Sequence, residues 1–444
     1  MPDEIEQNIE ADEVVNGKVE AAIAANAQAP VKVITKEAIA SMIEQAGQVG
    51  RSHDAAINIF NGIMAYAQSS RASDVHLEPI ENGSVVRIRV DGILHDMFKV
   101  SKELHVQMIA VLKVLTRMRT DEHRAPQDGR YEFKIGAGSV DVRVSIISVT
   151  DGEKAVLRLL SDASHDLSLE DLGLFDTDLQ RVQRAIERPW GMILATGPTG
   201  SGKTTTVYAI LEVLNQREIN ISTIEDPVEF DIEGVNQSQV DSSAKLTFAS
   251  GLRSIVRQDP DIIMVGEIRD EETASIAVNA ALTGHKLLST IHTNNAASTI
   301  VRLIDMKVEP FLISSTLICA VAQRLVRRVC DDCHKVKSWT KEEASKVLSP
   351  NSVIEMFGDK ESVAVPEVVG CVSCGETGYR GRVGIYEVLE NTKAIQKLIV
   401  SGADSDTIQE QALKEGMTTI AQDGIRKVRD QITTIEELIR VMRE

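Results

Sequence analysis

The stretch Gly197–Thr204 constrains the fold of this chain more than any other. It reads G-x-x-x-x-G-K-T, with an apolar run, Met192–Ala195, before it and a helical pattern, Thr205–Leu211, after it. A strand, a glycine-rich loop and a helix in this order form a phosphate-binding P-loop. Its backbone N–H groups and the helix N-terminus surround the phosphates. A glycine-rich turn arising by chance is the alternative, and the matching flanks disfavour it.

The loop predicts a nucleotide site that takes ATP and Mg²⁺. Lys203 is expected to reach the β- and γ-phosphates, and the Thr204 hydroxyl is expected to be a Mg²⁺ ligand. The residues predicted to bind the nucleotide are Gly197, Pro198, Thr199, Gly200, Ser201, Gly202, Lys203, Thr204 and Thr205.

Composition argues against several classes of protein. The net charge of −18 and the 3% of aromatic residues disfavour a general nucleic-acid surface, which is basic and rich in stacking side chains. No apolar run is long enough to span a membrane. The N-terminus lacks the basic and apolar segments of a secretory signal, so a cytoplasmic setting is expected.

The region before the P-loop is predicted to hold a tail and a small domain. Residues 1–50 begin with an acidic, alanine-rich stretch, which we expect to be disordered or to dock on a partner. Residues 51–160 change from helical spacing to alternating strands and predict a small α+β domain. Residues 161–175 are predicted to be a linker. The helices are expected near 53–68 and 102–118, and the strands near 75–79, 86–90, 93–98, 140–146 and 155–160.

Strand and helix patterns alternate from residue 176 to residue 329. This alternation predicts an α/β core with a parallel sheet and helices on both faces. Cys319 lies in an apolar stretch that we interpret as a helix, and we expect it to be a core residue. A cysteine-bearing region, 330–380, and a helical C-terminal region, 381–444, are predicted to follow. The last helix should begin at a capping box, Thr434-x-x-Glu437.

Acidic residues follow two of the predicted core strands. Glu225, Asp226 and Glu229 could order water around a Mg²⁺-nucleotide, although an ordinary acidic loop is an equally good interpretation. The buried-strand run 262–266 ends at Glu267, in the manner of a Walker B strand. Glu267 is the best candidate for polarising the attacking water.

Two histidines flank a further apolar strand, 287–291. His285 precedes the strand and His292 follows it. A histidine at a strand end could sense the γ-phosphate or relay its loss, but a lone histidine is as often structural.

Four cysteines form two C-x-x-C pairs, Cys330 with Cys333 and Cys371 with Cys374. Four thiolates at this spacing suit a tetrahedral structural Zn²⁺. Residues 334–370 should therefore form an excursion between the two halves of the site. Reduced structural cysteines or redox thiols are the alternatives.

These motifs together resemble one family, the bacterial type II secretion and type IV pilus assembly ATPases. The P-loop, the box 224–229, the segments 257–261 and 266–270, and the two histidine motifs follow one another in that family's order. The segments 71–78 and 87–92 match its preceding domain, and 370–382 matches its tetracysteine region. The resemblance covers residues 50–444 and implies a RecA-like P-loop core with a preceding small α+β domain, a zinc-binding subdomain and a helical C-terminal region.

The resemblance also implies roles for individual residues. Glu225, Asp226 and Glu229 match the family's Asp box, Glu267 its Walker B glutamate, and His285 with His292 its His box. The preceding domain would supply arginines to the nucleotide. The arginine candidates are Arg87 and Arg89, then Arg71, with Arg253 and Arg257 from the core side.

The family resemblance implies a homo-oligomeric, hexameric ring in the cytoplasm, associated with the inner membrane through a platform protein. ATP hydrolysis would drive assembly of a type IV pilus or a type II secretion pseudopilus. The alternatives are a pilus retraction ATPase, a nucleic-acid translocase and a non-catalytic nucleotide switch. Assembly-type members carry a further folded domain at the N-terminus, and only about 50 residues precede the small domain here, so the means of recruitment stays open.

Overall fold

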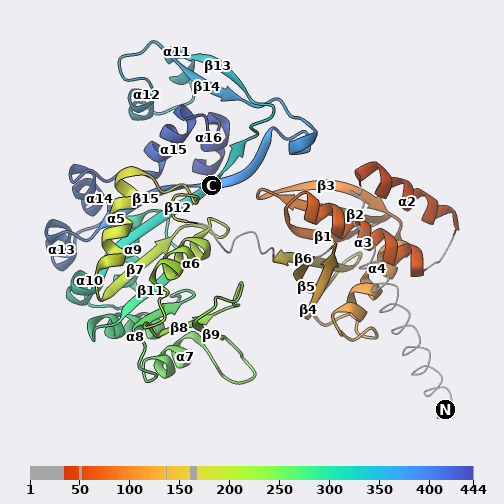
Figure 1. Cartoon of the computed structure of the whole chain (residues 1–444), viewed down its shortest axis with the longest axis horizontal. Helices are drawn as coiled ribbons and strands as arrows, with labels where there is room; N and C mark the ends of the chain where they lie inside the picture. Colours follow the sequence, from red (N-terminus) through yellow and green to blue (C-terminus); the bar gives the residue numbers. More distant parts are fainter. Residues whose placement is uncertain (1–34, 50–52, 137, 161–167, 444) are drawn as a thin grey trace. The chain divides into compact units, whose positions relative to one another are not determined.

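The protein is described here from a computed structural model that covers residues 35–49, 53–136, 138–160 and 168–443. It divides into two compact units, residues 1–163 and 164–444 (Figure 1). Each unit is described by itself. Most of the predicted tail, residues 1–34, and the first half of the predicted linker, residues 161–167, lie outside the described residues.

Unit 1 is a six-stranded antiparallel sheet with helices packed on one face. The sheet order is β3-β2-β1-β6-β5-β4. The strands are β1 (Ala72–Ile80), β2 (Gly83–Val90), β3 (Ile93–Val100), β4 (Gln127–Ile135), β5 (Gly138–Val149) and β6 (Gly152–Leu160), and the helices are α2 (Lys36–Val49), α3 (His53–Ser69) and α4 (Lys102–Leu115). Alternate strand residues such as Val86, Ile88, Val142 and Val144 share one buried core with Phe60 of α3.

The α+β prediction for this region is confirmed, with two additions. Helix α2 occupies part of the stretch that the sequence assigned to the tail, and strand β4 was not predicted. The apolar pattern of β4 is weak because charged and polar residues dominate it and only Phe133 is buried.

Unit 2 is built on a seven-stranded sheet with the order β15-β12-β7-β11-β10-β8-β9. The strands are β7 (Gly191–Thr196), β8 (Ile221–Glu225), β9 (Val235–Gln239), β10 (Ile262–Val265), β11 (Lys286–Ile291), β12 (Leu317–Val329) and β15 (Tyr379–Glu390). Strands β12, β7, β11, β10, β8 and β9 are parallel, and β15 pairs with β12 in the antiparallel sense.

Helices cover both faces of this sheet, as predicted. They are α5 (Asp176–Glu187), α6 (Lys203–Leu214), α7 (Phe248–Ile255), α8 (Glu271–Leu282), α9 (Ala296–Asp305) and α10 (Pro310–Thr316). In β7, Ile193 packs into the core formed with α5 and α6, whereas Met192 and Leu194 pack into the core formed with α7, α8 and α9. A strand buried on both sides needs apolar residues at every position, which explains the unbroken apolar runs in the sequence.

The structure corrects two interpretations near the end of the core. The stretch around Cys319 is strand β12 and not a helix, because a continuous apolar run buried on both faces has no period that separates strand from helix. Cys319 itself is fully buried, as expected of a core residue. The stretch after residue 380 begins with β15, a strand of the core sheet, before its helices start.

The remaining elements form an excursion and a helical cover. The excursion between the cysteine pairs holds β13 (Lys335–Thr340), α11 (Lys341–Ala344), α12 (Pro350–Phe357), β14 (Ser362–Glu367) and the short helix η2 (Val372–Cys374). The C-terminal helices are α13 (Lys393–Val400), α14 (Ser405–Lys414), α15 (Ile420–Arg429) and α16 (Ile435–Arg443). Helices α15 and α16 pack near β15 and β12.

Glu437 joins the last helix to the long strand β12. Its N–H donates to the Thr434 hydroxyl at 3.2 Å, so one half of the predicted capping box is present. Its buried carboxylate accepts from the backbone N–H of Arg327 at 3.1 Å and from the guanidinium groups of Arg327 and Arg440 at 2.7–2.9 Å. Burial alone would raise the pKa of Glu437, but these donors outweigh burial and lower it to about 2.

Removing this charge should destabilise unit 2 in a pH-dependent way. Glu437→Gln is expected to lower its free energy of unfolding by about 3 kcal/mol at pH 7. The carboxylate is more acidic in the folded state, so its contribution is complete above the ordinary pKa of 4.5 and is lost as the pH falls toward 2. Urea unfolding at pH 7, 4 and 3 should show that the difference in free energy of unfolding between wild type and Glu437→Gln becomes smaller as the pH falls. The neighbouring, exposed Glu436→Gln is the control, and a deficit that does not change with pH contradicts this account.

Candidate nucleotide and zinc sites

The nucleotide site lies where the parallel core strands end. Strands β7, β11, β10 and β8 run in register, so the segments that follow them meet at one edge of the sheet. That edge carries the P-loop after β7, Glu267 after β10 and His292 after β11. The acidic box begins at Glu225, the last residue of β8.

The P-loop glycines have backbone angles, and close contacts with β12, that residues with a Cβ atom would not tolerate. Gly200 and Gly202 have φ of 78° and 87°, in the left-handed region, and Gly202 precedes α6. At Gly197 a Cβ atom would lie 2.4 Å from the carbonyl oxygen of Gln323. The loop thus packs closely on β12 and leads into a helix N-terminus, the arrangement that fits a bound triphosphate. Thr204 and Thr205 occupy the first turn of that helix.

Lys203 is buried at the start of α6. Its ammonium donates to the carbonyl oxygens of Gly197 and Pro198 at 2.9 and 3.0 Å. Burial lowers the pKa of Lys203, and the carboxylate of Glu267 partly opposes this shift. The lysine therefore already lies inside the curve of the loop, where it would meet phosphate oxygens.

Glu267 is held between a histidine and an arginine. Its carboxylate lies 3.3 Å from Nε2 of His292 and forms an ion pair with Arg269. This ion pair raises the pKa of Arg269. Only 13% of the Glu267 side chain is exposed, whereas about half of His292 is exposed. A carboxylate fixed from two sides beside the P-loop lysine is suited to orient a water molecule and to accept its proton.

The three residues of the acidic box have different surroundings. Glu225 is buried and accepts hydrogen bonds from Tyr208, from Thr223 at 2.6 Å and from Gln237 at 3.2 Å. Its carboxylate thus stabilises the packing of α6 on β8. Asp226 is exposed and Glu229 is half-buried.

The structure separates the two predicted histidines. His285 precedes β11, and its carbonyl accepts from the N–H of Gly191 at the start of β7, so it lies at the opposite edge of the sheet. The six residues of β11 place it about 20 Å from the P-loop edge. Its Nδ1 bonds the carbonyl of Ala280 at 2.8 Å. The expectation that both histidines act at the phosphate is therefore corrected for His285. The two histidines flank one strand, so they lie at opposite edges of the sheet.

Four of the five candidate arginines bond to groups of their own unit. In unit 1, Arg87 donates to Asp96 and Glu78, and Arg89 pairs with Asp74 on the same face of the sheet. Arg71, at the turn before β1, has a positive φ of 54°. In unit 2, Arg253 on α7 pairs with Glu272, and Arg257 donates to the carbonyl of Arg253 at 2.8 Å. No contact in the described residues assigns any of them to the phosphate site.

Sequence reasoning missed several residues of this edge. Arg269 lies two positions after Glu267, a spacing that could have been noticed. Thr293, after β11, exchanges hydrogen bonds with Thr196 at the end of β7, at 2.6 and 2.9 Å. Gln323 donates to the P-loop carbonyl of Ser201 at 2.8 Å. A glutamine inside an apolar strand was a signal for this last contact.

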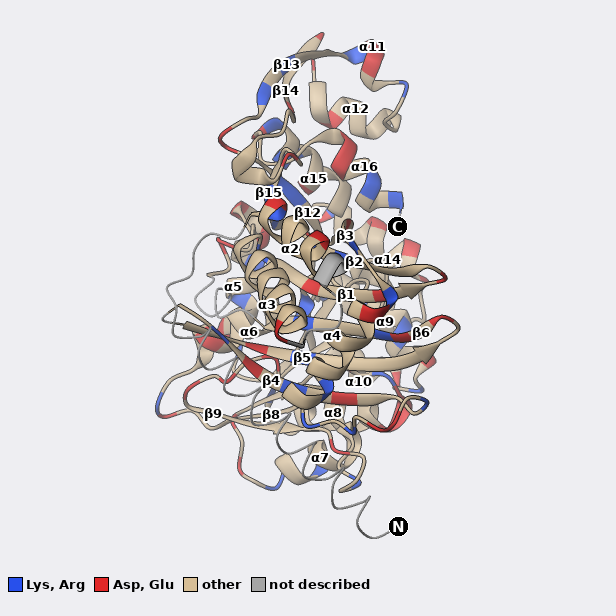
Figure 2. Cartoon of the chain, turned by 90° about the vertical axis from the view of Figure 1, so that its right-hand side faces the viewer, with Lys and Arg blue, Asp and Glu red and all other residues tan. Residues whose placement is uncertain are grey.

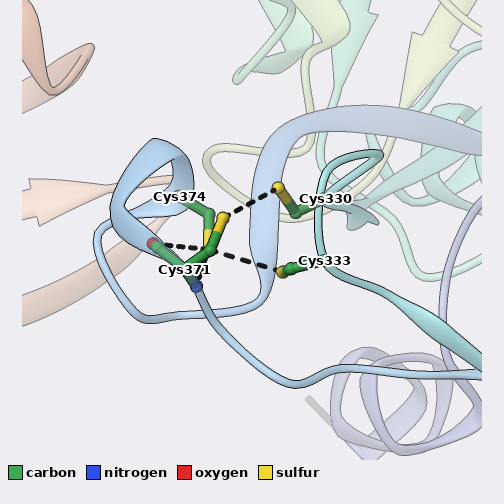
Figure 3. Close-up of side chains that lie close together, drawn as sticks. All are labelled: Cys330, Cys333, Cys371 and Cys374. Carbon is green, nitrogen blue, oxygen red and sulfur yellow. Dashed lines mark hydrogen bonds between the residues drawn. The ribbon is translucent and has the colours of Figure 1, made fainter.

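The four predicted cysteines come together beside the C-terminal end of β12 (Figure 3). Their Sγ atoms all lie within 4.8 Å of one another. The pairs Cys330–Cys371, Cys333–Cys374 and Cys371–Cys374 are 3.9, 3.9 and 3.8 Å apart. Tetrahedral Zn²⁺ with Zn–S bonds of about 2.3 Å places its sulfurs about 3.8 Å apart, so this set fits zinc.

Backbone donors favour the thiolate form of one cysteine of the cluster, Cys374. The N–H groups of Cys371 and Gly378 donate to Sγ of Cys374 at 3.1 and 3.2 Å. Burial opposes ionisation, but these donors outweigh it and bring the pKa of Cys374 to about 7. Nδ1 of His334 bonds the carbonyl of Cys330 at 2.9 Å. The excursion predicted between the pairs is present as the β13–β14 hairpin and its two helices.

Comparison with known proteins identifies the family. The family profile described as "Type II/IV secretion system protein" matches residues 51–440. The chain belongs to this family. It is 45% identical over 87% of its length to "Type II secretion system ATPase E" of Vibrio cholerae, covering 75% of that protein. It is 43% identical over 86% of its length to "Type IV pilus assembly ATPase PilB" of Myxococcus xanthus, covering 67% of it.

Solved structures agree with the fold. The Legionella pneumophila ATPase DotB matches with a TM-score of 0.64 at 21% identity, over 87% of this chain and 95% of its own. The pilus retraction motor PilT with bound ADP matches with a TM-score of 0.60 at 26% identity, over 86% of this chain and 96% of its own. The predicted ATPase family is confirmed, and with it the use of ATP and Mg²⁺. None of the described helices has the length and apolar character that crossing a membrane requires.

The two histidines should differ in their effect on hydrolysis. His292→Ala is expected to lower kcat at least tenfold because it removes a contact that orients Glu267. His285→Ala should change kcat less than twofold, since its side chain bonds a helix carbonyl at the other edge. Steady-state ATPase assays of both variants test this contrast. Equal losses of kcat would show that the position of a histidine at one edge or the other does not determine its effect on hydrolysis.

Zinc should hold the excursion but not the core. Cys330→Ser is expected to abolish metal binding, which is worth on the order of 10 kcal/mol to local folding. Amide exchange should then rise in β13, α12 and β14 while β7 and α6 stay protected. Mass spectrometry of the metal content and of hydrogen exchange measures both effects. Cys319→Ala, a change in β12 outside the cluster, should keep the metal, and a Cys330→Ser chain that keeps it contradicts the assignment.

Proposed function

We propose that this chain is the motor ATPase that drives assembly of a type IV pilus or a type II secretion pseudopilus. The observation that carries the proposal is the placement of Glu267, held by His292 and Arg269, at the edge that presents the P-loop. The named relatives, a type II secretion ATPase and a pilus assembly ATPase, support the biological direction of the work.

The residues of the core support a simple division of labour. The P-loop binds the phosphates, and Lys203 shifts from its loop carbonyls to the phosphate oxygens. Glu267 accepts the proton of the water that attacks the γ-phosphate in line. His292 contacts Glu267 and directly follows β11. It passes the change at the γ-phosphate to the segment that leads from β11 into α9. Mg²⁺ would be held by Thr204 and would supply charge neutralisation to the phosphates when bound.

Arginines of unit 1 complete the site in this proposal. Arg87 and Arg89 share one face of the sheet and are kept in place by the carboxylates of Glu78, Asp96 and Asp74. An arginine that meets charge developing in the transition state is worth roughly 10³–10⁵ in rate. Arg71, Arg253 and Arg257 are the further candidates. Sites completed between copies favour contacts that close into a ring, so we propose a hexamer.

The setting follows from the same family relation. We propose a cytoplasmic ring that works at the inner membrane through a platform protein. A retraction ATPase is the nearest alternative, and the cysteine cluster, a feature of the assembly branch that the sequence resembles, argues against it. A nucleic-acid translocase is disfavoured because Lys and Arg are interspersed with Asp and Glu along the described ribbon (Figure 2) and the net charge is −18.

ATP hydrolysis in the presence of two kinds of stimulant tests the proposal. Vesicles of inner membrane that contain a platform protein should raise the ATPase rate, and duplex or single-stranded DNA should not. Glu267→Gln should bind ATP and lose hydrolysis under both conditions. Stimulation by DNA alone would favour the translocase, and an unchanged rate in Glu267→Gln would leave a nucleotide switch.

A mixture of two inactive variants tests the arginines and the ring together. Arg89→Ala and Glu267→Gln chains should each be inactive. Mixed, they should recover part of the activity, because an intact Glu267 of one copy then meets an intact Arg89 of another. If activity does not recover when Arg89→Ala is mixed with Glu267→Gln, but does recover when Arg87→Ala is mixed with it, the role belongs to Arg87. Absence of recovery with every arginine variant contradicts sites shared between copies.

A further inference from the structure

Gln323 reaches the P-loop from the strand beside it. Strand β12 pairs with β7 up to the partners Ala322 and Thr196, so Gln323 stands opposite Gly197, the first residue of the loop. Gln323 is 1% exposed, and it belongs to a strand whose other residues are mostly apolar.

Three contacts join this residue to the loop. Its backbone carbonyl lies against Gly197, where a Cβ atom would come within 2.4 Å. Its Nε2 donates to the carbonyl of Ser201 at 2.8 Å. The same nitrogen lies 3.2 Å from where a Cβ of Gly202 would be. The beginning and the end of the loop are thus both fixed on one residue of β12.

We propose that Gln323 is a positioning residue that holds the P-loop in the shape that binds triphosphate. The inference rests on the proposed ATPase function and concerns the same site. Lys203 also bonds the loop, through the carbonyls of Gly197 and Pro198, but it gives up these bonds when it turns to a phosphate. The bond from Gln323 to Ser201 does not compete with phosphate and can persist. It therefore keeps the backbone N–H groups of the loop directed at the ligand.

A purely structural role explains Gln323 poorly. Its Oε1 is buried and has no hydrogen-bond partner in the part of the chain that the structure describes. A buried amide oxygen without a partner is unfavourable, so an apolar side chain of the same length would serve the core at least as well. The amide is explained by its Nε2, which satisfies a P-loop carbonyl.

Gln323→Met tests the proposal because it keeps the length and removes the donor. Loss of one buried hydrogen bond corresponds to about a tenfold change in a binding constant. We expect KM and the calorimetric Kd for ATP to rise about tenfold, with kcat changed less than threefold. Gln323→Glu, which cannot donate from Oε when ionised, should raise both constants as well and replaces the methionine variant if that one does not fold.

Asn391→Leu is the matched control. Asn391 is also buried, its Nδ2 donates to the carbonyls of Ser314 and Leu317, and its Oδ1 likewise has no partner among the described residues. Its replacement should lower the melting temperature about as much as Gln323→Met does, with no change in Kd for ATP.

Two outcomes overturn the proposal. One is a Kd for ATP within twofold of wild type in both folded Gln323 variants. The other is an equal rise of Kd in Asn391→Leu, which would mark a general loosening of the sheet. Calorimetric binding of ATP needs no platform protein or hydrolysis. A wild-type chain that binds ATP without motor activity would therefore refute the proposed function and leave this inference standing.

Discussion

The parallel alignment of β7, β11, β10 and β8 is the constraint on which the rest of unit 2 depends. Parallel strands in register bring the segments that follow them to one edge, and the P-loop, Glu225, Glu267 and His292 all lie there. The alignment is enforced by burial on both faces, since apolar side chains alternate between two cores along each strand. Stability and chemistry therefore come from the same strands, and the site residues lie at or just after the ends of these strands.

The close approach of the P-loop to β12 extends this constraint. Glycine at position 197 lets the loop pack on the carbonyl of Gln323, and the paired strands fix how near the two backbones come. The loop is thus shaped by the sheet as well as by its own glycines. The loop carbonyls of Gly197 and Pro198 hold the Lys203 ammonium, and the Glu267 carboxylate acts on it electrostatically.

The sequence predicted the parts of the protein whose pattern is local. Gly197–Thr204 lies between a strand and a helix in the chain, and each C-x-x-C pair is a short motif, so both could be recognised without a structure. His285 and His292 were predicted as a pair because they are near in sequence, yet a strand between them separates them in space. Ion pairs such as Glu267–Arg269 and long-range contacts such as Gln323–Ser201 depend on which strands become neighbours, and periodicity does not contain that information. The stretch around Cys319 was misread because burial on both faces removes the periodicity altogether.

The cysteine cluster closes the open end of a two-stranded ribbon. Strands β12 and β15 pair from Cys319 with Glu390 up to Val329 with Tyr379. Cys330 follows β12 directly, and residues 375–378 separate Cys374 from β15. Without the excursion, the two strands would form an ordinary hairpin whose mouth is held by metal. The length of the segment between Cys333 and Cys371 is therefore independent of the register of the core sheet, because the four thiolates fix the ends of that segment whatever lies between them. A longer or shorter excursion would therefore leave the pairing of β12 with β15 and the strands of the core beneath it unchanged.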